Sequence, residues 1–133
     1  MRDITTKFGK DAGRIWHLLN EKGSLKKDEI TRETSMSEKD VHAGVGWLAR
    51  ENKICKTEEG QFALDQTNLE SEIGSHAGRI YKILDIWEEV DYESIKRLSD
   101  LTDEEIHAAL GWLAREDKLT INKNNKFNLK QSI

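Results

Sequence analysis

The side chains that could do chemistry occur in matched pairs, 65 positions apart. His42 recurs as His107, and both lie in the same predicted helix of a repeated unit. A histidine can bind a metal, but neither one has a cysteine or a second histidine nearby to complete a ligand set. The glycine-rich phosphate loops and nucleophile elbows of common enzymes are also absent from the sequence. We therefore expect no metal centre, no cofactor and no enzymatic activity.

Contact with nucleic acid is a second kind of chemistry that the polar residues allow. The candidates lie on the outward face of the third predicted helix of each unit and in or just after the last predicted turn of the chain: Lys39, His42, His107, Lys123, Lys126 and Lys130. The first two turns of both helices lack the Asn, Gln or Arg that reads base edges by two-point contacts. Their acidic residues suit the positive end of a helix dipole but repel phosphate. The residues therefore favour weak or non-specific contact with double-stranded DNA over sequence-specific recognition.

Differences between the copies point to a protein interface. Charged residues of the first copy are replaced in the second by the large apolar residues Ile86, Trp87 and Tyr92. Such a cluster on a small domain is typical of a surface that docks the two copies together or binds a partner.

Trp47 and Trp112 are further interface candidates. Each indole lies beside small residues of the same helix, which would let another element approach closely. Two interpretations stay open: packing on the domain's own hairpin or first helix, or contact with the other domain or a second subunit.

A gapless duplication organises the chain. Residues 12–64 align with residues 77–129, and 18 of the 53 positions are identical. Each copy must then be a complete structural unit. We expect domains at 1–65 and 77–133, joined by a polar linker at 66–76 whose first residues could form a helical turn or two. Domains of this size are near the lower limit of independent stability, so each is expected to be stabilised by contact with the other domain or with a second molecule.

The charged positions that are the same in both copies include Arg14 and Arg79, Arg50 and Arg115, and Glu51 and Glu116. We expect them to form ion pairs inside each domain that hold the first helix against the third.

Each unit is predicted to contain three helices followed by a β-hairpin. In the first unit, the helices are expected over about 11–22, over 26–34 and from 38 onward, and the isolated Leu25 could form a very short strand. The third helix begins with a capping signal at Ser37 in one copy and Thr102 in the other. Gly60 and Asn125, which tolerate positive φ, occupy the same hairpin turn position. This order predicts a mainly α fold with small β-hairpins (α+β): tandem winged helix-turn-helix domains.

The unit also resembles a family of small prokaryotic winged helix-turn-helix domains of unassigned function. The resemblance rests on Ala-Gly-Arg-Ile near the start of each copy and on Gly-Trp-Leu-Ala-Arg-Glu at the end of the third helix. It implies the fold and a DNA-binding ancestry, but no catalytic residues and no ligand. The family usually occurs as single domains, so this chain resembles a homodimer fused into one polypeptide.

Composition limits the partners and the compartment. The net charge of −4 lies entirely in residues 66–133, and neither half has the basic surplus of a dedicated nucleic-acid binder. No signal peptide or membrane-spanning run is apparent, and the lone cysteine needs no oxidising compartment, so a cytoplasmic protein is expected. Two functions remain open: a DNA-binding protein of the transcription-regulator type, or a protein-interaction or assembly module that uses the second domain to bind a partner or to self-associate.

Overall fold

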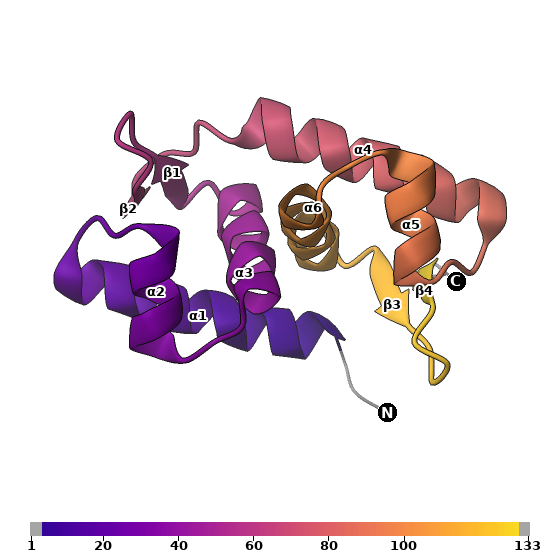
Figure 1. Ribbon diagram of the computed structural model, residues 1–133, viewed down its shortest axis with the longest axis horizontal. Helices are drawn as coiled ribbons and strands as arrows, with labels where there is room; N and C mark the ends of the chain where they lie inside the picture. The colour runs from indigo at the N-terminus through magenta and orange to yellow at the C-terminus, as the bar shows by residue number, and fades with distance from the viewer. Residues whose placement is uncertain (1–3, 131–133) are drawn as a thin grey trace.

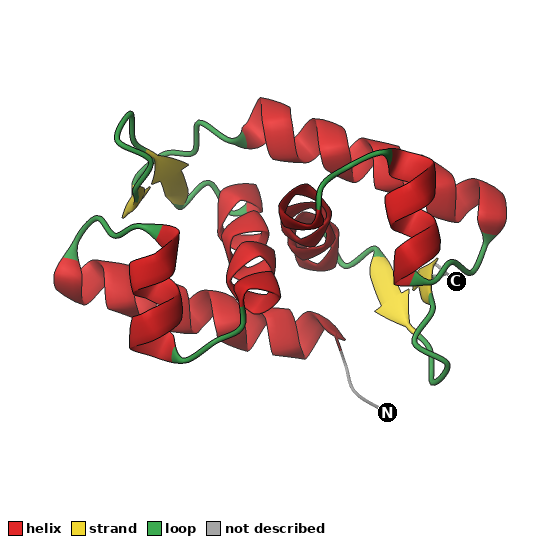
Figure 2. Cartoon of the chain, viewed as in Figure 1, coloured by secondary structure: helices red, strands yellow, loops and turns green. Residues whose placement is uncertain are grey.

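The computed structural model describes residues 4–130 as two winged helix-turn-helix domains arranged about a central helix pair (Figures 1 and 2). The first domain contains α1 (Ile4–Lys22), α2 (Lys27–Thr34), α3 (Glu38–Arg50), β1 (Ile54–Lys56) and β2 (Phe62–Leu64). The second contains α4 (Glu70–Trp87), α5 (Tyr92–Ser99), α6 (Asp103–Arg115), β3 (Leu119–Ile121) and β4 (Phe127–Leu129). The predicted fold class and the tandem arrangement are confirmed.

Local sequence signals form as predicted. The hydroxyl of Ser37 accepts a hydrogen bond from the Asp40 amide, and Thr102 forms the full capping box with Glu105. Each hairpin is a two-stranded antiparallel sheet whose turn includes a residue with positive φ, Gly60 or Asn125. Isolated bridges join Leu25 to Phe62 and Val90 to Phe127, so the short strand expected at Leu25 exists and extends the wing of the first domain.

The first helix of each domain is longer than predicted. α1 begins at Ile4 rather than near residue 11, and α4 begins at Glu70, so most of the predicted linker at 66–76 is helical. The extensions continue the apolar stripe of each helix, with Ile4 and Phe8 in α1 and Leu69 and Ile73 at the start of α4. The end positions 1 and 133 of the predicted domains lie outside the described residues.

These extensions bury their apolar residues in the other domain. Ile4 and Phe8 belong to the core of the second domain, which is built on residues such as Ile80 and Ile106. Leu69 and Ile73 belong to the core of the first domain. The exchange is reciprocal, so each domain completes the core of its twin. This is the mutual support that the small size of the units predicts.

None of the helices in residues 4–130 has the length and apolar character needed to cross a membrane.

Candidate functional site

The third helices of the two domains lie against each other at the centre of the molecule (Figure 1). A Cβ built on Gly46 of α3 would lie 1.8 Å from the carbonyl oxygen of Ala108, and one built on Gly111 of α6 would lie 1.8 Å from that of Ala43. The two backbones are therefore in direct contact, and no side chain fits between them at either glycine. The contact is isologous, because each helix offers the same Ala-x-x-Gly pair to the other.

The tryptophans pack at the edges of this contact. Trp47 lies over Gly9 of α1, where an added Cβ would be 3.1 Å from the indole, and Trp112 lies over Gly74 of α4 in the same way at 3.3 Å. Both indoles also adjoin the hydrophobic cores of both domains. Each tryptophan therefore packs on its own first helix and also contributes to the contact between domains, so the two interpretations of these residues are compatible.

The duplicated charges at the ends of α3 and α6 pair across the domains. Arg50 Nε lies 3.0 Å from a carboxylate oxygen of Glu116, and Arg115 Nε lies 2.8 Å from one of Glu51. The two guanidinium groups also lie over the indoles of the opposite domain, at 5.6 and 5.8 Å from the ring centres. The predicted ion pairs within each domain are therefore wrong for these four residues, because the twofold relation brings the helix ends of opposite domains together.

The third duplicated charge acts inside each domain, but not as an ion pair with the third helix. Arg14 donates a hydrogen bond to the carbonyl oxygen of Thr34, and Arg79 donates to that of Ser99 at 2.9 Å. Both arginines thus tie the first helix to the end of the second.

The two histidines lie where the N-terminal halves of α3 and α6 meet. His42 is 5% exposed, with Nδ1 3.9 Å from a carboxylate oxygen of Glu104. His107 donates from Nδ1 to the carbonyl oxygen of Asp103 at 2.7 Å, and its ring stacks on Tyr92 with centroids 5.0 Å apart. Burial lowers the pKa of both histidines. His42, predicted to face outward toward DNA, is instead enclosed between the domains.

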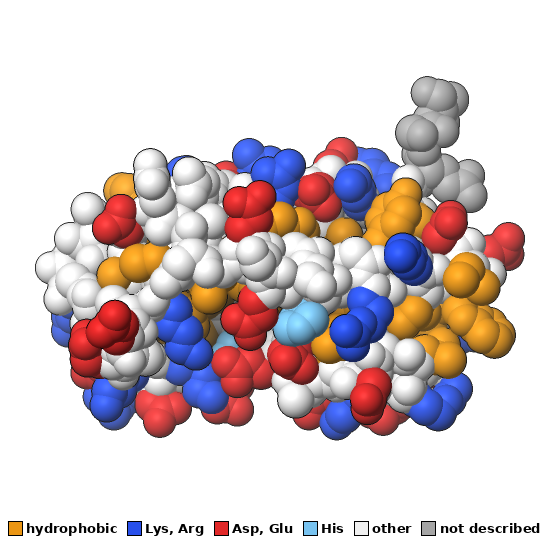
Figure 3. Space-filling model, turned by 90° about the horizontal axis from the view of Figure 1, so that it is seen from above, with side chains coloured by type: hydrophobic (Ala, Val, Ile, Leu, Met, Phe, Trp, Pro, Cys, Tyr) orange, Lys and Arg blue, Asp and Glu red, His pale blue; other side chains and the backbone are white. Residues whose placement is uncertain are grey.

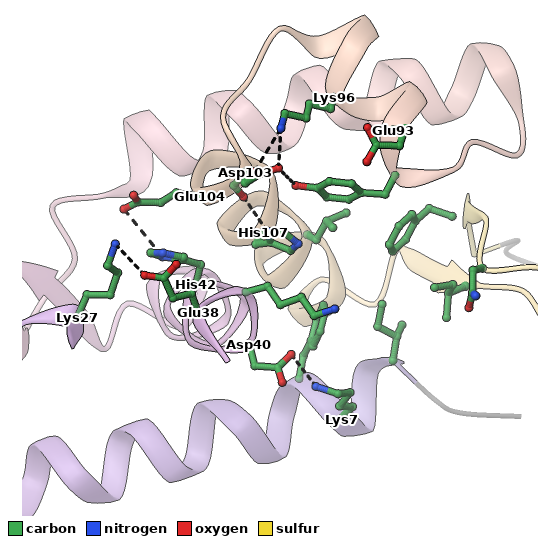
Figure 4. Close-up of a pocket in the computed structure, with 18 residues that line it drawn as sticks. Lys7, Lys27, Glu38, Asp40, His42, Glu93, Lys96, Asp103, Glu104 and His107 are labelled. Carbon is green, nitrogen blue, oxygen red and sulfur yellow. Dashed lines mark hydrogen bonds and ion pairs between the residues drawn. The ribbon is translucent and has the colours of Figure 1, made fainter. Parts of the chain in front are cut away.

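A cleft of about 920 Å³ opens beside His107, and we call it the large cleft (Figure 4). Side chains from both domains line it, including Lys7, Lys39, Tyr92, Asp103 and His107. Lys39, predicted as a DNA contact, therefore borders this cleft. A related cleft of about 230 Å³, the small cleft, lies beside His42 and is formed by the equivalent elements with the domains exchanged.

The three lysines of the basic C-terminal turn do not line either cleft, although the turn itself reaches the large one. Lys123 and Lys126 are exposed in the loop between β3 and β4, and Lys130 is bound to Asp117 at 2.8 Å. Asn125 of the same loop reaches the large cleft. The structure thus does not bring the three lysines together with His42.

The predicted apolar cluster of the second domain divides into two parts. Ile86 is 72% exposed and Trp87 is 58% exposed, whereas Tyr92 is half-buried in the large cleft, where its hydroxyl donates to Asp103. Leu98 of α5, which is 40% exposed, replaces Glu33 of the first domain just as Trp87 replaces Lys22. We call Ile86, Trp87 and Leu98 the apolar patch. Figure 3 shows hydrophobic side chains gathered at the end of the molecule where α4 ends.

Several residues of the interdomain contact were not identified from the sequence. The glycines Gly46 and Gly111 were noticed only as small neighbours of the tryptophans, and Ile4 and Phe8 were not recognised as apolar positions of a longer helix. A signal existed for both: the repeated Ala-x-x-Gly pair, and the helical spacing that links Ile4 and Phe8 to the first helix. Residues 4–130 contain no cluster of three or more His, Cys, Asp or Glu that could hold a metal ion.

Comparisons with known proteins agree with this architecture. An uncharacterised protein of Methanocaldococcus jannaschii, MJ1608, is 41% identical to this chain over 56 residues, which are 41% of this chain and 80% of the archaeal protein. That length corresponds to one of the two units. The comparison with solved structures gave no match. The sequence profile described as Winged helix-turn-helix domain (DUF2582) matches residues 1–64 and again residues 67–129. The chain therefore belongs to this winged helix-turn-helix family and carries its domain twice.

Proposed function

We propose that this protein is a non-enzymatic interaction module, in which two winged helices form one pseudo-symmetric body that binds another protein. The crossing of α3 and α6 carries the proposal. A winged helix reads a DNA sequence by placing its third helix in the major groove, which requires one face of that helix to be free. Here the equivalent faces of α3 and α6 lie against each other with a glycine and an alanine of each helix in backbone contact.

The apolar patch is the surface that we propose for the partner. In the first domain, the positions of Trp87 and Leu98 hold Lys22 and Glu33, whose charged groups form an ion pair at 3.0 Å. Replacing that exposed pair with two large apolar side chains, beside a third at Ile86, is unfavourable in water unless another surface covers them. The single free cysteine, Cys55, fits a reducing compartment such as the cytoplasm.

Non-specific contact with duplex DNA through the C-terminal turn is the second candidate. Lys123 and Lys126 are exposed, and neither forms an ion pair within residues 4–130. The net charge of −4 opposes strong binding, because neutralisation of phosphate supplies most of the affinity of such contacts.

Fluorescence titration with labelled duplexes separates the two candidates. If the protein is an interaction module, duplexes of different sequence should bind alike. Their Kd should be no lower than the roughly 10⁻⁴–10⁻⁶ M of non-specific complexes at physiological salt. Any such binding should disappear in the Lys123→Glu, Lys126→Glu double variant. Nanomolar, sequence-selective binding would refute the proposal.

Cross-linking followed by capture from the source cell tests the partner surface. The Trp87→Ser variant should lose a partner that the unchanged chain retains, while its unfolding curve stays within experimental error of the parent. Lys22→Ser is the matched control, because it changes the equivalent position of the first domain. Equal loss in both variants, or no loss in Trp87→Ser, would argue against a partner at the apolar patch.

A further inference from the structure

The large cleft has the size and the wall of a small-molecule site. Its volume of about 920 Å³ lies within the range of about 300–1,000 Å³ that is usual for ligand pockets, whereas the small cleft, at about 230 Å³, lies below it. One part of its wall is apolar and comes from three elements: Ile4 and Phe8 of α1, Leu110 of α6, and Ile121 and Phe127 of the second hairpin. An apolar body could be covered there on several sides.

One ammonium group at this wall has no carboxylate to neutralise it. Of the lysines that line the cleft, Lys7, Lys27 and Lys96 are each held by a carboxylate at the start of α3 or α6, at 2.8, 3.5 and 3.2 Å. Lys39 forms no ion pair within residues 4–130. Its charge acts on His107, whose pKa is lowered chiefly by burial and further by Lys39. Both Lys39 and His107 line the large cleft.

His107 is fixed in one orientation that leaves a nitrogen available. Nδ1 donates to the backbone carbonyl of Asp103, so in the neutral ring Nε2 has no proton and can only accept a hydrogen bond. Stacking on Tyr92 holds the plane of the ring. Figure 4 shows the ring on the cleft side of α6, with Glu93 and Glu104 on opposite sides of it. These carboxylates disfavour a multiply charged anion such as a nucleoside triphosphate.

The small cleft has the opposite charge at the equivalent positions. Glu72 and Glu104 stand where the large cleft has Lys7 and Lys39, and Lys56 stands where it has Ile121. The duplication thus left one cleft that is small and acidic, and one that is open, apolar on one side and cationic at Lys39.

From this contrast we propose that the large cleft binds a small monocarboxylic acid with an apolar body. The ammonium group of Lys39 holds the carboxylate beside the ring of His107, and the apolar body lies against Phe8, Ile121 and Phe127. This proposal does not depend on the proposed interaction function, because it rests on different residues and has its own readout.

A titration followed by ¹H–¹⁵N and histidine ring NMR tests the proposal on the full chain with three probes. Phenylacetate has both a carboxylate and an apolar ring, phenethylamine has the ring with a cation, and acetate has the carboxylate alone. We expect phenylacetate to bind with a Kd of about 1 mM or tighter, at least about tenfold tighter than either other probe. The shifts should centre on His107 and Phe127, and not on residues of the small cleft such as His76.

Two variants localise the binding. Lys39→Glu, which introduces the residue of the equivalent position 104, should weaken phenylacetate at least about tenfold. Lys10→Glu makes the same change of charge at an exposed lysine of α1 that does not line the cleft, and it should leave the Kd unchanged. Equal affinity for all three probes, absence of phenylacetate binding, or an unchanged Kd in a folded Lys39→Glu variant would overturn the proposal.

Discussion

At the far end of the first domain, Lys22 of α1 and Glu33 of α2 form an exposed ion pair at 3.0 Å. At the same place in the second domain, Trp87 and Leu98 leave much of their apolar surface in solvent. Near the centre of the molecule the domains are alike instead: both keep His, Ala, Gly, Trp and Arg at the same positions of the third helix, followed by Glu directly after it. The two copies therefore differ strongly at the outer ends of the domains and are alike where α3 and α6 cross.

The twofold relation explains this division. In an isologous contact, a residue of one copy meets its partner, and the equivalent residue of the other copy meets the same kind of partner. Ala43 meets Gly111 as Ala108 meets Gly46, and Arg50 pairs with Glu116 as Arg115 pairs with Glu51. One change in either copy affects the shared contact, so these positions are held alike, whereas surface positions can change in one copy alone.

The largest effect is expected from a side chain placed in the crossing of α3 and α6. Gly46→Leu should lower the free energy of unfolding by about 3 kcal/mol or more, because the new Cβ would meet the backbone of Ala108 and only separation of the helices relieves it. Chemical denaturation measures the change. Gly13→Ala is the matched control, because nothing lies within 4 Å of its added methyl group, and it should stabilise by about 0.5–1 kcal/mol. Similar destabilisation in both variants would contradict the crossing.

Truncation of Phe8 tests whether the domains complete each other's cores. Phe8→Ala should cost about 3 kcal/mol, since the ring is 7% exposed and belongs to the core of the second domain. Amide hydrogen exchange should accelerate more in α6 and β4 than in α2. Ile73→Ala is the reciprocal change, and it should loosen the first domain. If Phe8→Ala loosened only its own domain, the exchange of core residues would be disproved.

A smaller effect is expected at the end of α4, where both copies have positive φ but only the first has a glycine. Glu88 has φ +69° and ψ −64°, whereas the equivalent residue of the first domain is Gly23 with φ +82°. Glu88→Gly should raise the free energy of unfolding by about 1 kcal/mol, because glycine adopts positive φ without the steric cost of a Cβ. Thermal unfolding provides the measurement. A decrease in stability would show that the Glu88 side chain matters more than the backbone strain.

The smallest expected effect is a pH dependence that both copies share. Burial lowers the pKa of His42 and His107 in the folded state, so the unfolded chain binds protons more readily at these positions. Their contribution to stability is therefore complete above the ordinary histidine pKa of about 6.5 and is lost as the pH falls below it. Urea unfolding between about pH 7.5 and 5 should show the loss, and the His42→Gln, His107→Gln double variant should reduce it. An unchanged slope in the double variant would assign the effect to other groups.

The sequence was sufficient for elements whose signals are local. Ser37 and Thr102 cap their helices, and Gly60 and Asn125 form the hairpin turns, because each signal acts within a few residues of the chain. Relations between the copies were harder to predict. The helical spacing of Gly46 and Arg50 does not show which surface they contact. The same spacing would result if their partner were in the same domain, in the other domain or in DNA. Ile4 and Phe8 were missed for the same reason: the core that they complete lies in the other domain.

A nuclear Overhauser measurement between the two third helices in solution is the most direct test of their contact. The crossing predicts strong cross-peaks from the methyl group of Ala108 to the α protons of Gly46, and the reciprocal set from Ala43 to Gly111. They should persist when random-sequence duplex DNA is added. Absence of both sets in the folded chain, or their loss on addition of DNA, would show that the third helices are free to enter a groove and would contradict a permanent contact between α3 and α6.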